Sequence, residues 1–197
     1  MKRLAAGLVS IASLIAPLLV AAPAVAQDRI TAVHAFPSNW VYSRSFLEFV
    51  KKANEAGKGV FQISVRGGPE AIGMFEQPNA VRDGVVDMVY TPCAFYAAAV
   101  PECDAVSAST IDGPTARKSG AWDALKEAHI RRMGVYYLGW YDTGIRFNLW
   151  STKEPRFDAQ GNLDIKGMKV RGNPIYNAFF TNVLGALFID MATTETY

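Results

Sequence analysis

The pattern of apolar and polar residues predicts an alternation of strands and helices. Residues 29–36, RITAVHAF, predict a β-strand, and residues 60–68, VFQISVRGG, alternate as a second strand does. Between them, residues 43–59 carry apolar side chains at helical spacing: Phe46, Phe49, Val50 and Ala53. Gly57 is expected to end this helix because glycine favours helix ends.

The central part of the chain continues the alternation. A turn at residues 67–73, GGPEAIG, is followed by a short helix that Pro78 opens, and residues 85–91, VVDMVYT, predict a buried strand. Residues 115–134 predict one amphipathic helix, and residues 135–141, VYYLGWY, its following strand. The apolar stripe of that helix consists of Trp122, Leu125, His129 and Met133.

The last third predicts another strand, helix and strand. A polar loop at residues 153–165 precedes a strand at 168–171, a helix that begins at Asn173, and an apolar strand at 186–191. The helix is expected to gather five apolar residues on one face: Tyr176, Phe179, Phe180, Val183 and Leu184. Strands that alternate with helices indicate an α/β fold.

The first residues have the three parts of an export signal. Lys2 and Arg3 form a basic start, residues 4–20 are mostly apolar, and Ala24-Val25-Ala26 is a small-x-small cleavage site. Pro17 and the short apolar core argue against a retained membrane helix. Residues 1–26 are therefore predicted to be a signal peptide, with the mature chain starting near Gln27.

Cleavage there would leave a mature chain without net charge. Lys2 and Arg3 belong to the 20 lysines and arginines of the chain, and all 18 acids follow residue 26. Bulk charge thus gives no indication of a nucleic-acid partner or of an anionic membrane surface.

Two cysteines, Cys93 and Cys103, lie ten positions apart. In an exported chain they form either a disulfide or two small buried thiols, and the sequence leaves both open because it does not give their separation in space. A metal site is not expected, since no histidine is near them in the sequence.

Arg171 is the strongest candidate for ligand binding. It ends an apolar strand and precedes Gly172, Asn173 and Pro174, which are expected to open a helix whose N–H groups favour an anion. A guanidinium there can hold a carboxylate through two hydrogen bonds. The alternative is a surface arginine paired with an acid.

Arg146 lies in an aromatic segment and has two possible roles. It can stack on its neighbours as a structural residue, or turn into a cleft. If Arg146 and Arg171 converge, their mutual repulsion creates an anion site that a ligand carboxylate would relieve.

The residues for catalysis are few. His129 falls on an apolar helical stripe, His34 lies within a predicted strand, and no nucleophile–base motif, metal motif or phosphate loop is present. Glu70 is either a solvated turn residue or an acceptor for a ligand hydroxyl or amine. Four aromatic residues can serve either as core or as apolar walls of a cleft: Phe36, Trp40, Phe95 and Tyr96.

Four stretches together resemble a known family. They are GGPEAIG at residues 67–73, AVRDGVVDMVYT at 80–91, GVYYLGWYDTGIRF at 134–147, and DIKGMKVRGNPIYNAFFTNVLGA at 164–186. In this order they resemble the substrate-binding proteins of tripartite ATP-independent periplasmic (TRAP) transporters, the C4-dicarboxylate-binding family. The resemblance runs from about Ile30 to the end, and the last stretch is its most specific part.

The resemblance implies roles for individual residues. Arg171 matches the arginine that forms a salt bridge with the substrate carboxylate, and Arg146 matches a second arginine that often assists it. Asn173 matches a position near the carboxylate, and Glu70 a variable position that contacts the rest of the ligand. Thr193 matches a pocket position that is often aromatic, so the shape of that wall is open.

The resemblance also implies an architecture and a partner. Members have a periplasmic binding protein-like (type II-like) fold of two α/β lobes, and they deliver an organic acid to membrane permease subunits. Residues 27–145 would form the first lobe, and 146–197 a crossing strand and the start of a second lobe that is incomplete in this chain, which suggests a fragment. No cofactor is implied. A ligand-sensing module of the same fold and a secreted enzyme that uses His34 or Glu70 as a base are the alternatives.

Overall fold

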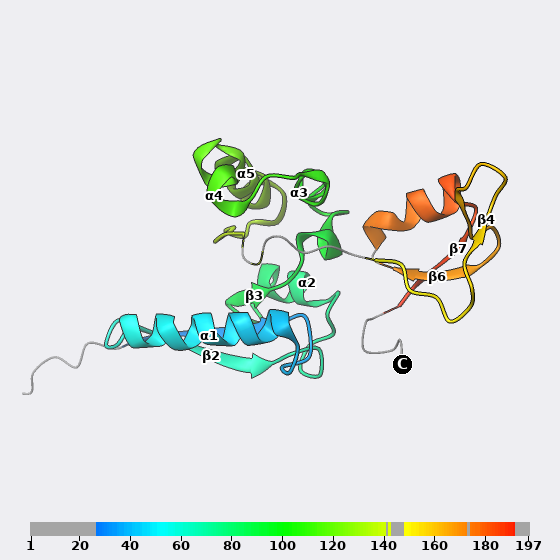
Figure 1. Cartoon of the computed structure of the whole chain (residues 1–197). Coiled ribbons are helices and arrows are strands. Elements are labelled where there is room, and N and C mark those ends of the chain that lie inside the picture. Colours follow the sequence, from blue (N-terminus) through cyan, green and yellow to red (C-terminus); the bar gives the residue numbers. More distant parts are fainter. Residues whose placement is uncertain (1–26, 141, 143–147, 173, 192–197) are drawn as a thin grey trace, which may run out of the picture.

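The structure is a computed structural model in which residues 27–140, 142, 148–172 and 174–191 are described. Parallel strands and helices make up the first part of the chain, and a smaller group of strands and helical turns follows (Figure 1). The elements are β1 (Asp28–His34), α1 (Val41–Ala56), β2 (Phe61–Gly67), α2 (Gln77–Arg82), β3 (Met88–Tyr90), the 3₁₀ turn η1 (Cys93–Tyr96), α3 (Cys103–Ala108), α4 (Gly113–Lys118), α5 (Ala121–Met133), β4 (Arg156–Phe157), β5 (Leu163–Asp164), β6 (Lys169–Gly172), the 3₁₀ turn η2 (Pro174–Tyr176), the π-helical turn η3 (Phe179–Val183) and β7 (Leu187–Asp190).

The first sheet is parallel and has the order β2–β1–β3. Neighbouring residues of β1 face opposite sides of it, as a strand requires. Ala32 packs with Phe46 and Val50 of α1 on one face, whereas Val33 packs with Ala80 of α2 on the other. A helix therefore covers each face, which is the arrangement expected for buried parallel strands.

The carboxyl ends of β1 and β3 meet at one edge of this sheet, because His34 pairs with Tyr90. The chain leaves β1 toward Phe36 and leaves β3 toward Thr91 and η1. Two loops that are distant in sequence are thereby brought together at the edge where open parallel sheets usually bind ligands.

The prediction of a single helix over residues 115–134 is wrong. This segment consists of α4 and α5, separated at Gly120, whose φ of +83° is left-handed and interrupts the helical path. The predicted stripe is largely confirmed in α5, where Leu125, His129 and Met133 are buried.

The prediction of a strand over residues 135–141 is also wrong for residues 135–140, the part that the structure describes. Residues 135–140 form no strand, and Tyr136 and Leu138 are 63% and 64% exposed. Strand-like side chains do not suffice, because an isolated extended segment has no neighbour for its backbone N–H and C=O groups.

The second group of strands consists of a hairpin, β4–β5, and a parallel pair, β6–β7. Its small core contains Ile165, Val170 and Ala186. The helix expected from Asn173 appears as the turns η2 and η3, and no residue of its predicted apolar face is fully buried. Phe180 packs against the core, whereas Phe179 is 52% exposed.

None of the helices formed by the described residues combines the length and the apolar character that crossing a membrane requires.

Candidate functional site

A large groove of about 1490 Å³ lies at the carboxyl ends of the strands. One side is formed by the loop after β1, the end of β3, η1, residues 133–140 and Asp142. The other side is formed by the end of β6 together with η2 and η3. The groove therefore has walls next to the β2–β1–β3 sheet and next to the β6–β7 pair, which are far apart in the sequence.

A second cavity, of about 350 Å³, lies beside the β4–β5 hairpin. It is lined by charged surface side chains, including Lys153, Glu154, Arg156 and Lys166. All four are exposed, so they provide no water-excluding wall. The large groove is the better candidate because it combines apolar walls with a small number of polar groups.

Arg171 lines the large groove at the end of β6. It is half-buried, and its Nε donates a hydrogen bond to the carbonyl oxygen of Met191 at 2.9 Å. This bond ties the guanidinium to the segment after β7. The neighbouring Gly172 has no room for a side chain, because a Cβ there would lie 2.9 Å from the Phe188 ring.

The position of Arg171 agrees with the sequence argument. The residue stands at the carboxyl end of a strand, immediately before the helical turns η2 and η3. Three other predicted binding residues, Arg146, Asn173 and Thr193, lie outside the described residues.

Trp40 and Phe95 both line the groove, and they belong to a larger aromatic wall. Phe36 stacks on Trp40, with ring centroids 5.7 Å apart, and meets Phe95 edge-on at 5.8 Å. Phe75 joins Phe95 at 4.9 Å, and Tyr42 lies 5.2 Å from Phe36. We call these five residues, Phe36, Trp40, Tyr42, Phe75 and Phe95, the aromatic wall.

Hydrogen bonds hold the loop that carries Phe36. The Phe36 carbonyl oxygen accepts bonds from His34 Nδ1 at 2.7 Å and from Ser43 Oγ at 2.8 Å. His34 is only 1% exposed and thus belongs to the support of the loop. Gln77 adds a bond from its Nε2 to the His34 carbonyl oxygen at 2.9 Å.

Glu70 is not among the residues that line the groove. Its carboxylate accepts a hydrogen bond from the backbone N–H of Gly68 at 2.7 Å. Bonds from the N–H groups of Gly68 and of Glu70 itself lower the pKa of this carboxyl, because they stabilise the charged form. In the described structure Glu70 therefore closes the turn after β2.

Asp142 is a groove residue that the sequence argument missed. Its carboxylate accepts hydrogen bonds from the Tyr90 hydroxyl and from the Ser45 hydroxyl. The distance from Ser45 Oγ to Asp142 Oδ2 is 3.0 Å. Residues of β3 and α1 are thus joined to the segment after α5. No local signal marks this role, because the partners are 52 and 97 positions away.

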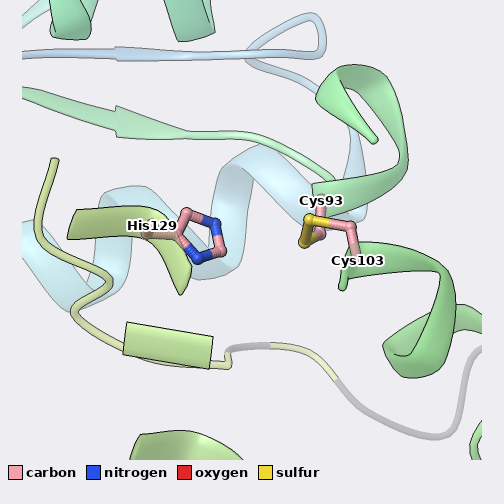
Figure 2. Close-up of side chains that lie close together, drawn as sticks. All are labelled: Cys93, Cys103 and His129. Carbon is pink, nitrogen blue, oxygen red and sulfur yellow. A yellow bond between two sulfur atoms is a disulfide. The ribbon is translucent and has the colours of Figure 1, made fainter. Parts of the chain in front are cut away.

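Cys93 and Cys103 form a disulfide, which decides between the two alternatives that the sequence left open. Their Cα atoms are 5.3 Å apart, and the bond joins η1 to α3 (Figure 2). His129 lies next to them, so a histidine distant in sequence is near the cysteines in space. With both sulfurs bonded to each other, His129 is the one metal-ligand group left in this cluster.

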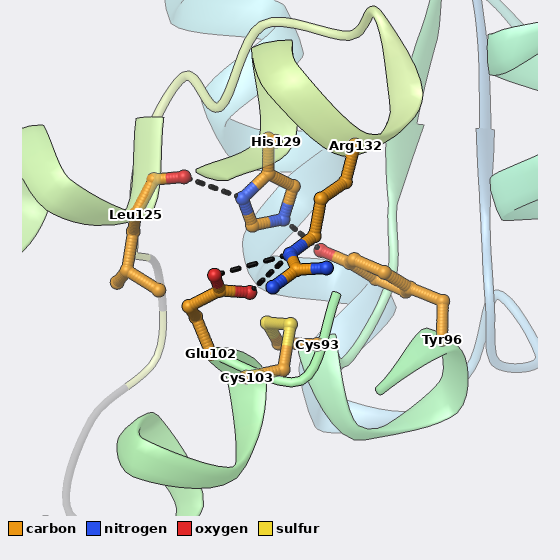
Figure 3. Close-up of a disulfide and its surroundings, with 7 residues drawn as sticks. All are labelled: Cys93, Tyr96, Glu102, Cys103, Leu125, His129 and Arg132. Carbon is orange, nitrogen blue, oxygen red and sulfur yellow. Dashed lines mark hydrogen bonds and ion pairs between the residues drawn. A yellow bond between two sulfur atoms is a disulfide. The ribbon is translucent and has the colours of Figure 1, made fainter. Parts of the chain in front are cut away.

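Ion pairs and hydrogen bonds surround the disulfide (Figure 3). Arg132 Nε and Arg131 Nη2 lie 2.8 and 3.0 Å from the Glu102 carboxylate, which connects α5 to the start of α3. His129 Nδ1 donates to the Leu125 carbonyl oxygen at 2.7 Å, which leaves Nε2 to accept from the Tyr96 hydroxyl at 3.1 Å. The ring is therefore held in one tautomer.

The burial of His129 predicts a pH dependence of stability. Burial lowers the pKa of the His129 ring from its usual value near 6.5, because the charged form loses hydration. The unfolded chain then takes up the proton first as the pH falls, so the free energy of unfolding should decrease below about pH 6.5. Urea denaturation between pH 5 and 7.5 should show this decrease, and His129→Gln should flatten it. An equal slope in both proteins would contradict the assignment.

Comparisons with known proteins place this geometry in context. No family model matches the chain. Solved structures do match. One is a TRAP periplasmic solute-binding protein from a Sulfitobacter species with bound β-D-galacturonate, at 22% identity and a TM-score of 0.67, covering 86% of this chain and 57% of that one.

Two further solved structures are also similar to this chain. A TRAP periplasmic solute-binding protein from Roseobacter denitrificans with bound β-D-glucuronate has 20% identity and a TM-score of 0.69, and the match covers 86% of this chain and 57% of that one. Another from Pseudoalteromonas atlantica, with bound sodium and pyruvate, has 15% identity and a TM-score of 0.71, covering 87% and 53%. The chain thus spans just over half the length of the solved structures it matches.

Proposed function

We propose that this chain, which has the α/β fold of TRAP periplasmic solute-binding proteins, captures a small organic acid in the groove between the β2–β1–β3 sheet and the β6–β7 pair. The carboxylate would be held by Arg171, and the loaded protein would deliver the acid to membrane permease subunits. The observation that carries the proposal is the position of Arg171, a cation that lines the groove at the end of β6.

A charge-assisted hydrogen bond contributes about 1.5–3 kcal/mol. Two such bonds to one carboxylate would supply a large share of the roughly −8 kcal/mol that a micromolar dissociation constant represents. The bond from Arg171 Nε to Met191 supports this role because it fixes the side chain before a ligand arrives. Less conformational entropy is then lost on binding. Arg146 and Asn173 are proposed to assist, and Thr193 to complete the wall.

The groove is suited to a change of conformation on binding. The aromatic wall lies on loops and helical segments next to the first sheet, whereas Arg171 belongs to β6. A ligand that contacts both walls binds better when they are close together and shifts the population toward the closed state. Closure would also remove water from the ion pair and strengthen it.

Export to the periplasm follows from the predicted signal peptide at residues 1–26 and agrees with the location named for the matched structures. The arrangement of the histidines favours a binding protein over an enzyme. His34 is buried and does not line the groove, and both ring nitrogens of His129 have hydrogen-bond partners. Neither ring offers an obvious base for a bound acid.

A thermal-shift screen of organic acids tests the proposal. The acid that binds should raise the melting temperature, because a ligand at about a hundred times its dissociation constant adds roughly 2.7 kcal/mol to the free energy of unfolding. The panel should contain dicarboxylates, oxo acids, sugar acids and aromatic acids, with the corresponding amides as uncharged controls. If no acid shifts the transition, or if amides act as well as acids, the proposal is wrong.

A further inference from the structure

Aromatic side chains line a large part of the groove. The five residues of the aromatic wall come from four segments, and each side chain is half-buried rather than enclosed in the core. Their rings contact one another at centroid distances of 4.9 to 5.8 Å. They form a continuous apolar surface that faces the groove.

The opposite side adds apolar rings next to the cation. Tyr176, Phe179 and Phe180 follow Arg171 along the chain and line the same groove. Phe179 is 52% exposed and does not pack against the small core of β6 and β7. Covering this ring with an apolar part of a ligand would remove it from water, which is favourable.

Several polar side chains of the described groove have partners within the protein. Asp142 accepts from Tyr90, and His129 is bonded at both nitrogens. Asp87 accepts from both the N–H and the hydroxyl of Thr31 at 2.7 Å. Thr91 Oγ1 is buried without a hydrogen-bond partner among the described residues. It offers a partner for a ligand hydroxyl.

We infer that the ligand is an aromatic carboxylate, whose acid group pairs with Arg171 and whose ring lies between the aromatic wall and Phe179. The inference rests on the proposed function and names its substrate class. A flat apolar ring suits this groove because aromatic rings gain from stacked and edge-on contacts beyond their buried area. A sugar acid would use these rings less fully, because each of its hydroxyls needs a hydrogen bond once it is buried.

Calorimetry with defined acids tests the inference. The probes are benzoate, 4-hydroxybenzoate, phenylacetate and cinnamate, compared with D-glucuronate and succinate, on the full chain after export and removal of its leader. At least one aromatic acid should bind about tenfold or more tightly than both non-aromatic acids. It should also change the fluorescence of the protein, since Trp40 belongs to the aromatic wall.

Two exposed phenylalanines provide a matched pair of variants. Phe179→Leu removes a ring from the groove, and Phe157→Leu removes one from β4, outside it; these side chains are 52% and 61% exposed, so neither change should unfold the chain. Phe179→Leu should weaken binding of the aromatic acid by about three- to tenfold. Phe157→Leu should leave it unchanged.

The outcomes separate the two proposals. Tighter binding of D-glucuronate or succinate than of every aromatic acid would overturn the inference and leave the proposed function intact. Aromatic binding that Phe179→Leu does not weaken would also overturn it, because the ring would then lie elsewhere. A chain that binds no acid at all would overturn the proposed function itself.

Discussion

Replacing Arg171 with methionine is expected to weaken binding of the carboxylate ligand by about a hundredfold or more. Methionine keeps much of the length and apolar stem of the side chain but removes the charge and every donor. Two charge-assisted bonds of about 1.5–3 kcal/mol each are lost, which corresponds to at least two powers of ten in the dissociation constant. Calorimetry with the acid found in the thermal-shift screen measures this loss.

Two further variants make the result specific. Arg171→Lys keeps the charge but cannot present two parallel donors, so its affinity should fall between those of the wild type and Arg171→Met. Arg156→Met removes an exposed guanidinium from β4, where it lies 3.7 Å from Asp164, and should bind the acid normally. Equal affinities of Arg171→Met and the wild type would end the assignment of Arg171 as the carboxylate partner.

The stability of Arg171→Met must be measured alongside its affinity. The bond from Arg171 Nε to the Met191 carbonyl oxygen is lost as well, at a cost of about 1–2 kcal/mol in the free energy of unfolding. A modest drop in melting temperature is therefore expected in the absence of ligand. The loss of affinity counts as a binding effect only at temperatures where the variant is fully folded.

Much of the fold could be predicted because its strands and helices are set by nearby residues. The apolar pattern of residues 29–36 and 43–59 corresponds to β1 and α1, and Gly57 ends the helix as expected. The errors arise where distant parts of the chain decide. Residues 135–140 have strand-like side chains, yet no neighbouring strand pairs with them.

The candidate site was predictable to a similar degree. Arg171 could be found because its position follows from one strand and the helical turns directly after it. Phe75 could not be assigned to the groove, because its place beside Phe95 depends on how α2 and η1 pack. Asp142 could not be found either, since its partners Tyr90 and Ser45 are joined to it only in the folded chain.

The disulfide also depends on the fold, and breaking it is expected to destabilise the chain by about 2.7 kcal/mol. A bond between Cys93 and Cys103, ten positions apart, restricts the unfolded chain by roughly this free energy in the loop-entropy model. For a domain of this size the loss corresponds to a fall of about 5–10 °C in melting temperature. Thermal denaturation of Cys93→Ala/Cys103→Ala against the wild type measures it.

A reducing agent supplies the matched control for this variant. It should lower the melting temperature of the wild type toward that of the double variant and leave the variant itself unchanged. A wild type that is indifferent to reduction under conditions where its free thiols are shown to form would contradict the prediction. Reduction breaks the bond in the wild type without replacing a side chain. It therefore separates the effect of losing the bond from the effect of replacing Cys103, which is fully buried.

Loss of the disulfide should affect ligand binding as well as stability. The bond fixes η1, which carries Phe95 and Tyr96 on the groove wall, to α3. Without it, more conformational entropy must be lost when η1 is ordered around a ligand, which lowers affinity. The acid should therefore bind more weakly to the reduced wild type, with Arg171 unaltered. This effect should be smaller than that of Arg171→Met, because the guanidinium–carboxylate pair remains.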